Sequence, residues 1–166
     1  MNTSVRTLVS CCALLVACSL IAAEAAKLDL KDVKCPISGG AAKEAGVAEY
    51  KGAKVYFCCM NCPEGFKKET AKFASKANHQ LVQTKQFEQK CCPLAGKPVN
   101  DEKSVTIGGV AVKFCCDGCK GKVEKATDEE KLELVFADKA FDKAFGLPKK
   151  EEKKEVKKDT KGKDKE

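Results

Sequence analysis

Two stretches of the chain alternate between apolar and polar residues on either side of a glycine-containing pair, a pattern that is typical of β-hairpins. The segments are 48–50 and 53–57 around Lys51-Gly52, and 104–107 and 110–114 around Gly108-Gly109. Glycine readily adopts the positive φ angles that two-residue turns require. The pattern therefore predicts two short hairpins in a small α+β protein.

Helical signals follow each hairpin. Pro63 suits the first turn of a helix, because an amide hydrogen has no partner there. Four residues then recur at the spacing of one helical face: Phe66, Thr70, Phe73 and Ala77. In the second half, residues 127–130 have the form of a capping box, and Phe141 with Phe145 before Gly146 indicates a short closing helix.

The beginning of the chain has the pattern of an export signal. Arg6 precedes a largely apolar run over residues 8–23, and Ala23-Glu24-Ala25 supplies the small residues that a signal peptidase needs. We expect residues 1–26 to be removed and the mature protein to reach the periplasm or cell envelope. Residues 15–18 also resemble a bacterial lipobox with its lipid on Cys18, and only that lipid would bring the protein to a membrane.

Composition and charge exclude several classes of protein. The chain has 166 residues, with 31 basic and 24 acidic side chains, 12 cysteines and one histidine. Residues 148–166 are rich in Lys and Glu and are expected to form a disordered tail. The charges there alternate in sign without aromatic residues, so we expect no nucleic-acid partner. With no phosphate-binding loop and no nucleophile elbow, the sequence predicts a protein that is not an enzyme.

The sequence contains an internal duplication. Residues 35–39 match residues 92–96, and residues 55–62 match residues 112–119, at one offset of 57 residues without a gap. A fixed offset over cysteines, proline and glycine indicates a repeated structural unit. We place the units at 28–90 and 91–147 and expect them to pack together, because no flexible linker separates them.

Each unit carries four cysteines whose thiols can converge. A turn cysteine precedes a cluster of three; the two sets are Cys35 with Cys58, Cys59 and Cys62, and Cys92 with Cys115, Cys116 and Cys119. Cysteines two or three residues apart at a strand-to-helix junction can direct their sulfurs to one point, and a hairpin can return the turn cysteine to them. Thiolates bind zinc and copper(I). The sequence predicts two metal sites, with zinc or copper as the ion.

The pattern Cys-x22-Cys-x3-Cys, entered by Cys-Pro-x-x-Gly and an aromatic residue, resembles the YHS/TRASH group of small cysteine-rich domains. The resemblance covers residues 33–125 and implies two tandem treble-clef-like modules that bind, sense or traffic heavy metals in bacteria. It implies these ligands: Cys35, Cys58 and Cys62, and Cys92, Cys115 and Cys119. Cys59 and Cys116 depart from the family pattern, so which cysteine of each adjacent pair is the ligand stays open.

Other readings of the cysteines remain. A unit of about 57 residues is near the limit for folding on apolar burial alone, so a metal or disulfide staple is expected in each. The alternative function is therefore a disulfide- or zinc-stapled module that binds a partner protein in the envelope. Nine cysteines lie beyond the signal, and an all-disulfide framework would leave one free, most simply the unrepeated Cys91. His79 is expected at the end of the first helix with its ring in solvent, not as a ligand.

Overall fold

The structure, a computed structural model, describes residues 29–148. The predicted export signal with Cys18 and, apart from Pro148, the predicted tail lie outside these residues. Among the described residues, no helix combines the length and apolar character that crossing a membrane requires.

Both predicted hairpins are present. Strand β1 (Lys43–Tyr50) pairs antiparallel with β2 (Ala53–Phe57), and β4 (Asn100–Ile107) pairs antiparallel with β5 (Val110–Phe114). The turn residues have positive φ angles: Lys51 (51°), Gly52 (76°), Gly108 (53°) and Gly109 (85°). The register shifts near the start of β1 and at the matching place in β4, so the two copies share even this irregularity.

Within residues 29–148, five helices accompany the strands: α1 (Cys62–Lys68), α2 (Thr70–Gln83), α3 (Asp117–Glu124), α4 (Asp128–Phe136) and α5 (Asp138–Ala144). The capping box at Thr127 and the short closing helix α5 are confirmed. The single helix predicted from Pro63 onwards is wrong, because the backbone of Glu69 leaves the helical conformation at φ −127° and ψ 43°. Phe66 in α1 and Ala77 in α2 are buried, whereas Thr70 and Phe73 in the first turns of α2 are only half-buried.

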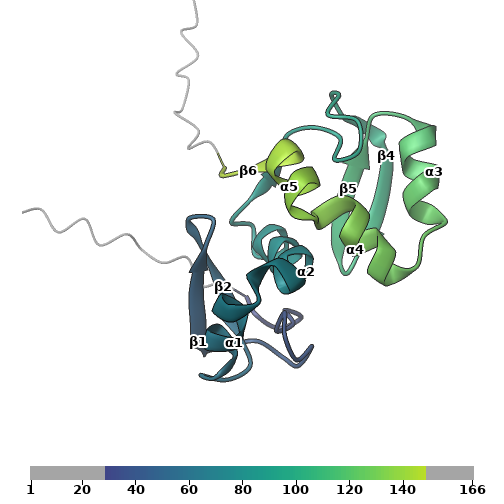
Figure 1. Cartoon of the computed structure of the whole chain (residues 1–166). Coiled ribbons are helices and arrows are strands. Elements are labelled where there is room, and N and C mark those ends of the chain that lie inside the picture. The colour runs from purple at the N-terminus through teal and green to yellow at the C-terminus, as the bar shows by residue number, and fades with distance from the viewer. Residues whose placement is uncertain (1–28, 149–166) are drawn as a thin grey trace, which may run out of the picture.

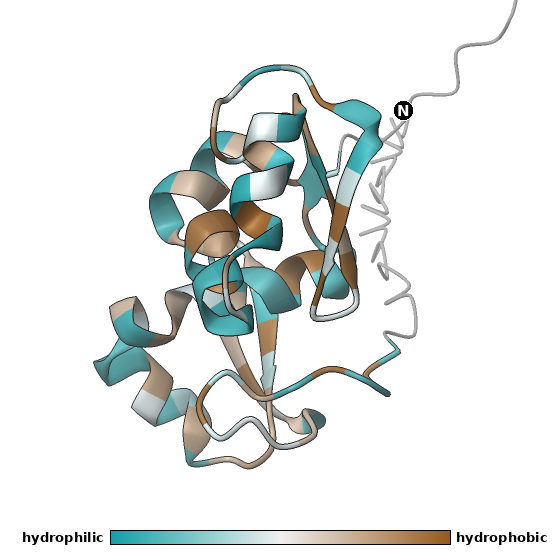
Figure 2. Cartoon of the chain, turned by 90° about the vertical axis from the view of Figure 1, so that its right-hand side faces the viewer, coloured by the Kyte–Doolittle hydropathy of each residue, from teal (hydrophilic) through white to brown (hydrophobic). Residues whose placement is uncertain are grey.

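The two units pack around the central helices. In Figure 1, the β1–β2 hairpin with α1 lies on one side, the β4–β5 hairpin with α3 lies on the other, and α2, α4 and α5 lie between them. The short strand β3 (Glu88–Gln89) pairs with β6 (Phe145–Gly146), which ties the end of the chain to the segment between the units. Figure 2 shows hydrophobic residues alternating with hydrophilic ones along the central helices and strands.

One hydrophobic core serves both units. Phe57 and Phe66 of the first half and Phe114, Phe136 and Phe141 of the second half belong to a single cluster of buried side chains. The two units therefore pack against each other, as expected from the absence of a flexible linker. One shared core also buries a larger fraction of the chain's surface than two separate cores of about 57 residues each would.

Polar contacts also join the halves. The Tyr50 hydroxyl donates a hydrogen bond to Asp138 Oδ1 at 2.8 Å, and the Lys51 ammonium forms ion pairs with Asp138 and Asp142. The buried Asn78 amide donates to the Phe136 carbonyl oxygen at 2.9 Å. These contacts fix the tip of the first hairpin and helix α2 against the second unit.

Candidate metal centres

The first centre is formed by three thiols from three separate elements. Cys35 lies in a turn closed by hydrogen bonds from its own amide to the Gly40 carbonyl oxygen and from the Gly39 amide to its carbonyl oxygen. Cys58 follows the last residue of β2, and Cys62 begins α1. The three sulfur atoms all lie within 4.8 Å of one another, and those of Cys58 and Cys62 are 3.6 Å apart.

The second centre repeats this arrangement. The Cys92 amide donates to the Lys97 carbonyl oxygen, and the Gly96 amide donates to that of Cys92, which closes the same kind of turn. Cys115 follows β5 and Cys119 lies in α3, with their sulfurs 3.8 Å apart. The sulfurs of Cys92, Cys115 and Cys119 again lie within 4.8 Å of one another.

The spacing of the sulfurs fits a bound metal ion. Two thiolates that bind zinc at tetrahedral angles, each about 2.3 Å from the ion, lie about 3.8 Å from each other. The observed 3.6 and 3.8 Å match that separation and far exceed the length of a disulfide, about 2.05 Å. Among residues 29–148, neither group includes a histidine or carboxylate, so both centres offer sulfur donors alone. Such a donor set favours zinc and copper(I) over magnesium or calcium.

The remaining member of each adjacent pair lies outside its centre. Cys59 and Cys116 are exposed and do not belong to either group of mutually close sulfurs. Each still touches its centre: the Cys59 sulfur is 3.3 Å from that of Cys62, and the Cys116 sulfur is 3.8 Å from that of Cys115. The sulfurs that complete the centres are those of Cys58 and Cys115, which lie four residues before Cys62 and Cys119.

Hydrogen bonds stabilise one thiolate in each centre. Burial alone would raise the pKa of the Cys35 thiol, but hydrogen bonds from the Ser38 side chain and from nearby backbone amides outweigh it and lower the pKa to about 7. The pKa of the Cys92 thiol is also lowered, against its burial, mainly by the amides of Ala95, Cys115 and Leu94. Because a metal binds the thiolate, the two turns prepare the first ligand of each centre.

The helical thiols of the two centres, Cys62 and Cys119, have raised pKa values. Hydrogen bonding to Cys59, followed by burial, raises the pKa of the Cys62 thiol. Burial and then hydrogen bonding to Cys115 raise the pKa of the Cys119 thiol to about 12. Because metals bind thiolates, metal binding to the three thiols of each centre, its trio, must release the protons that Cys62 and Cys119 hold.

The two centres differ in a hydroxyl group of the turn. The Ser38 hydroxyl lies 3.1 Å from the Cys58 sulfur and accepts a hydrogen bond from the Gly40 amide at 3.2 Å. The corresponding residue of the second unit is Ala95, which has no hydroxyl. The first centre thus has a side-chain hydrogen bond to sulfur that the second centre lacks.

A glutamine side chain holds each turn against its hairpin. The buried Gln80 of α2 donates from Nε2 to the carbonyl oxygens of Lys34 and Tyr56, at 3.0 and 2.8 Å, and accepts from the Tyr56 amide. Lys34 immediately precedes Cys35, and Tyr56 lies two residues before Cys58. The Gln80 side chain therefore joins the segment before the Cys35 turn to strand β2, which leads to Cys58.

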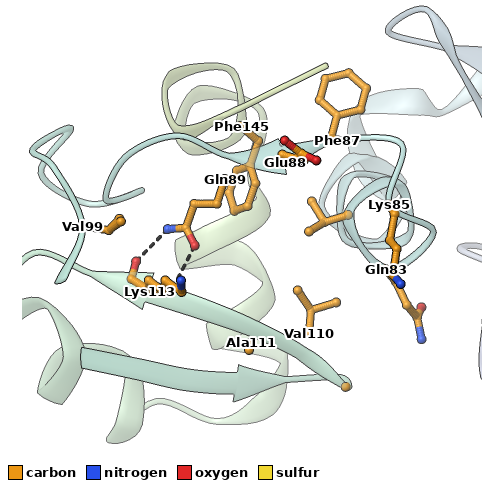
Figure 3. Close-up of a pocket in the computed structure, with 12 residues that line it drawn as sticks. Gln83, Lys85, Phe87, Glu88, Gln89, Val99, Val110, Ala111, Lys113 and Phe145 are labelled. Atoms are coloured by element: carbon orange, nitrogen blue, oxygen red, sulfur yellow. Dashed lines mark hydrogen bonds between the residues drawn. The ribbon is translucent and has the colours of Figure 1, made fainter. Parts of the chain in front are cut away.

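Gln89 does the same in the second unit. Its Nε2 donates to the carbonyl oxygens of Cys91 and Lys113, at 3.0 and 2.6 Å, and its Oε1 accepts from the Lys113 amide (Figure 3). Cys91 and Lys113 correspond to Lys34 and Tyr56 at the repeat offset of 57, but Gln89 does not correspond to Gln80. Neither glutamine could be predicted from the sequence, because the two residues make equivalent contacts from positions that the repeat does not relate.

We expect Gln89→Ala to lower the metal affinity of the second centre by about tenfold, because supporting residues of this kind orient the ligands. Gln86→Ala is the matched control: Gln86 bridges the amide and carbonyl of Lys54 in the same way but contacts neither turn. Competition titration against a chromogenic chelator measures both variants. Equal affinities in the two variants would show that Gln89 does not position the ligands.

His79 differs from its prediction. It lies inside α2 and is half-buried, with its ring 5.0 Å from that of Phe136 and its Nε2 donating to the Ile107 carbonyl oxygen at 2.9 Å. Burial lowers the pKa of the imidazole, which favours the neutral ring. Gly108 permits this contact, because a Cβ there would lie 2.6 Å from His79 Nε2. The expectation of an exposed ring at the helix end is wrong, because the second hairpin packs across this part of α2.

Cys91 belongs to neither centre, and its thiol donates to the Lys143 carbonyl oxygen at 3.3 Å. All nine cysteines of residues 29–148 have free thiols.

In comparisons with known proteins, no family model, curated protein or solved structure matches this chain. The geometry of the two centres therefore carries the functional argument. It shows a cysteine-rich protein with two groups of thiols that are able to hold a metal ion.

Proposed function

We propose that this chain is an exported, non-catalytic protein of two tandem YHS/TRASH-like units, at 28–90 and 91–147, that bind one zinc or copper ion each. Its role is the handling or sensing of that metal in the bacterial periplasm or envelope. The proposed ligands are Cys35, Cys58 and Cys62 in the first unit and Cys92, Cys115 and Cys119 in the second.

The observation that carries the proposal is the convergence of three thiols, once in each unit, at distances that suit a metal ion. Cysteines that are 23 and 27 residues from Cys35 meet it only because a hairpin returns the chain. The second unit repeats this convergence, and in both units backbone amides donate hydrogen bonds to the thiol of the turn cysteine. This repetition supports the proposal that both groups of thiols bind a metal.

The shared core favours metal handling over a purely structural metal. Small domains that depend on a structural zinc lack enough apolar burial to fold without it. Here five fully buried phenylalanines from both units lie in one cluster, so the chain has a source of stability besides the metal. A protein that folds in the metal-free state can gain and release its ion without unfolding.

Metal titration of the reduced protein tests the proposal. We expect two equivalents of zinc or copper(I) to bind per chain, measured by native mass spectrometry with elemental analysis. Cobalt(II) substitution should give the sulfur-to-metal absorption of thiolate ligands, and circular dichroism should show a folded metal-free state.

A protein that folds normally while fully oxidised, and that binds no metal after reduction, would overturn the proposed function. That result would favour a disulfide-stapled module whose partner is another protein of the envelope. A metal-free form that unfolds completely would instead assign the metal a structural role.

A further inference from the structure

Each centre has a solvent-exposed thiol beside it, at the same position in both units. Cys59 and Cys116 are exposed, whereas the turn cysteines Cys35 and Cys92 are only 1% and 0% exposed. Each centre is therefore closed on the side of its turn and open on the side of its adjacent cysteine.

The exposed thiol lies close to part of its trio and not to all three sulfurs. The Cys59 sulfur lies 3.3 Å from that of Cys62, and the Cys116 sulfur lies 3.8 Å from that of Cys115. Neither belongs to the groups whose sulfurs all lie within 4.8 Å. A standing fourth ligand would approach all three sulfurs equally, as tetrahedral geometry demands.

The backbone of the residue that carries the first exposed thiol packs closely against β1. Gly46 lies in the irregular part of β1 and packs against Cys59, where a Cβ would lie 2.6 Å from the Cys59 carbonyl oxygen. No side chain therefore separates β1 from the chain at Cys59. The neighbouring Met60 is 68% exposed, so the surface beyond the thiol is open to an approaching molecule.

We propose that Cys59 and Cys116 are exchange thiols, through which each trio gains or loses its metal ion to a thiol-bearing molecule in solution. The proposal rests on the proposed function and adds the class of exchange partner, a thiol compound or a cysteine-containing carrier.

The exchange is a substitution of ligands without a change of oxidation state. As the Cys59 sulfur bonds the metal, its proton passes to water; the bond from Cys62 to the metal breaks, and Cys62 takes up a proton. A thiolate of the partner then binds the same ion from the solvent side, and the bonds to the remaining protein sulfurs break in turn. The metal keeps its electrons throughout, so the step needs no oxidant or reductant.

Alkylation of the loaded protein gives the first test. We expect N-ethylmaleimide to modify Cys59 and Cys116 in the metal-loaded chain and to spare the six trio cysteines, as read by mass spectrometry of peptides. Protection of Cys59 and Cys116 together with the trios would make them standing ligands and overturn the proposal.

Transfer kinetics give the second test. The double variant C59S/C116S should keep two equivalents of metal but deliver them to dimercaptosuccinate, a dithiol, about tenfold more slowly, because the exposed thiol that first displaces a trio ligand is lost. Cys91→Ser is the matched control, since Cys91 is outside both centres, and should transfer at the wild-type rate.

The outcomes separate this proposal from the proposed function. A decrease in rate of less than threefold in C59S/C116S would overturn the exchange role and leave metal binding by the trios intact. Loss of either equivalent in that variant would make Cys59 or Cys116 a standing ligand, which also overturns the exchange role. A wild-type protein that binds no metal would remove both proposals, and the titration described above detects that case independently.

Discussion

Replacing Cys35 by serine is expected to leave the chain with one bound metal ion instead of two. A serine hydroxyl stays protonated at neutral pH and is a poor ligand for a soft ion, so the first centre would keep only two thiolates. We expect its affinity to fall by about 100-fold or more, at the upper end of the loss that follows from disturbing a supporting residue. The second centre should be unaffected.

The reciprocal variant makes the result specific. Cys92→Ser should empty the second centre and spare the first, and the double variant should bind no metal at either. Native mass spectrometry gives the stoichiometry, and Cys91→Ser, which replaces the preceding thiol outside the centre, serves as the control. If Cys35→Ser kept both ions at wild-type affinity, the turn cysteines would not be ligands.

Phe141→Ala is expected to cause a large loss of stability, about 3–5 kcal/mol of the free energy of unfolding. Its ring is fully buried and stacks on that of Phe145 at 5.2 Å, and it lies 5.0 Å from that of Phe87. Removing it leaves a cavity at the junction of the two units. Because that junction belongs to the shared core, we expect both hairpins to unfold in one transition at a lower denaturant concentration.

Urea denaturation of the metal-free reduced protein measures this effect without a contribution from metal binding. Leu147→Ala is the control, since Leu147 is 53% exposed and its truncation should change the free energy of unfolding by less than about 0.5 kcal/mol. Two separate transitions in the variant would contradict a common core, because one unit would then keep its structure while the other lost it.

The hairpins and the pattern of cysteines could be predicted because they depend on short-range chemistry. Lys51-Gly52 and Gly108-Gly109 adopt positive φ angles within two residues of sequence, and the capping box at Thr127 depends on contacts three residues apart. The duplicated spacing likewise brings each turn cysteine near its cluster once the hairpin forms. These predictions needed no knowledge of how the units pack.

The break at Glu69, the buried contacts of His79 and the roles of Gln80 and Gln89 could not be predicted in this way. The contacts of the three side chains depend on partners far away in sequence, since His79 reaches Ile107 and Gln80 reaches Lys34. Gln89 replaces Gln80 functionally from a position that the repeat does not relate to it. Hydrogen-bond partners of this kind follow from packing, not from periodicity or spacing.

The sequence by itself determined two hairpins, a duplication and thiols close enough to meet, because backbone turns and ligand spacing are local properties. Only the tertiary structure decided that Cys58 and Cys115 complete the trios while Cys59 and Cys116 face solvent. It also decided that both units share one core, since α2 of the first half and α4 and α5 of the second bury their apolar faces against each other. Burial is a property of the whole assembly of helices and strands, and no single stretch of sequence specifies it.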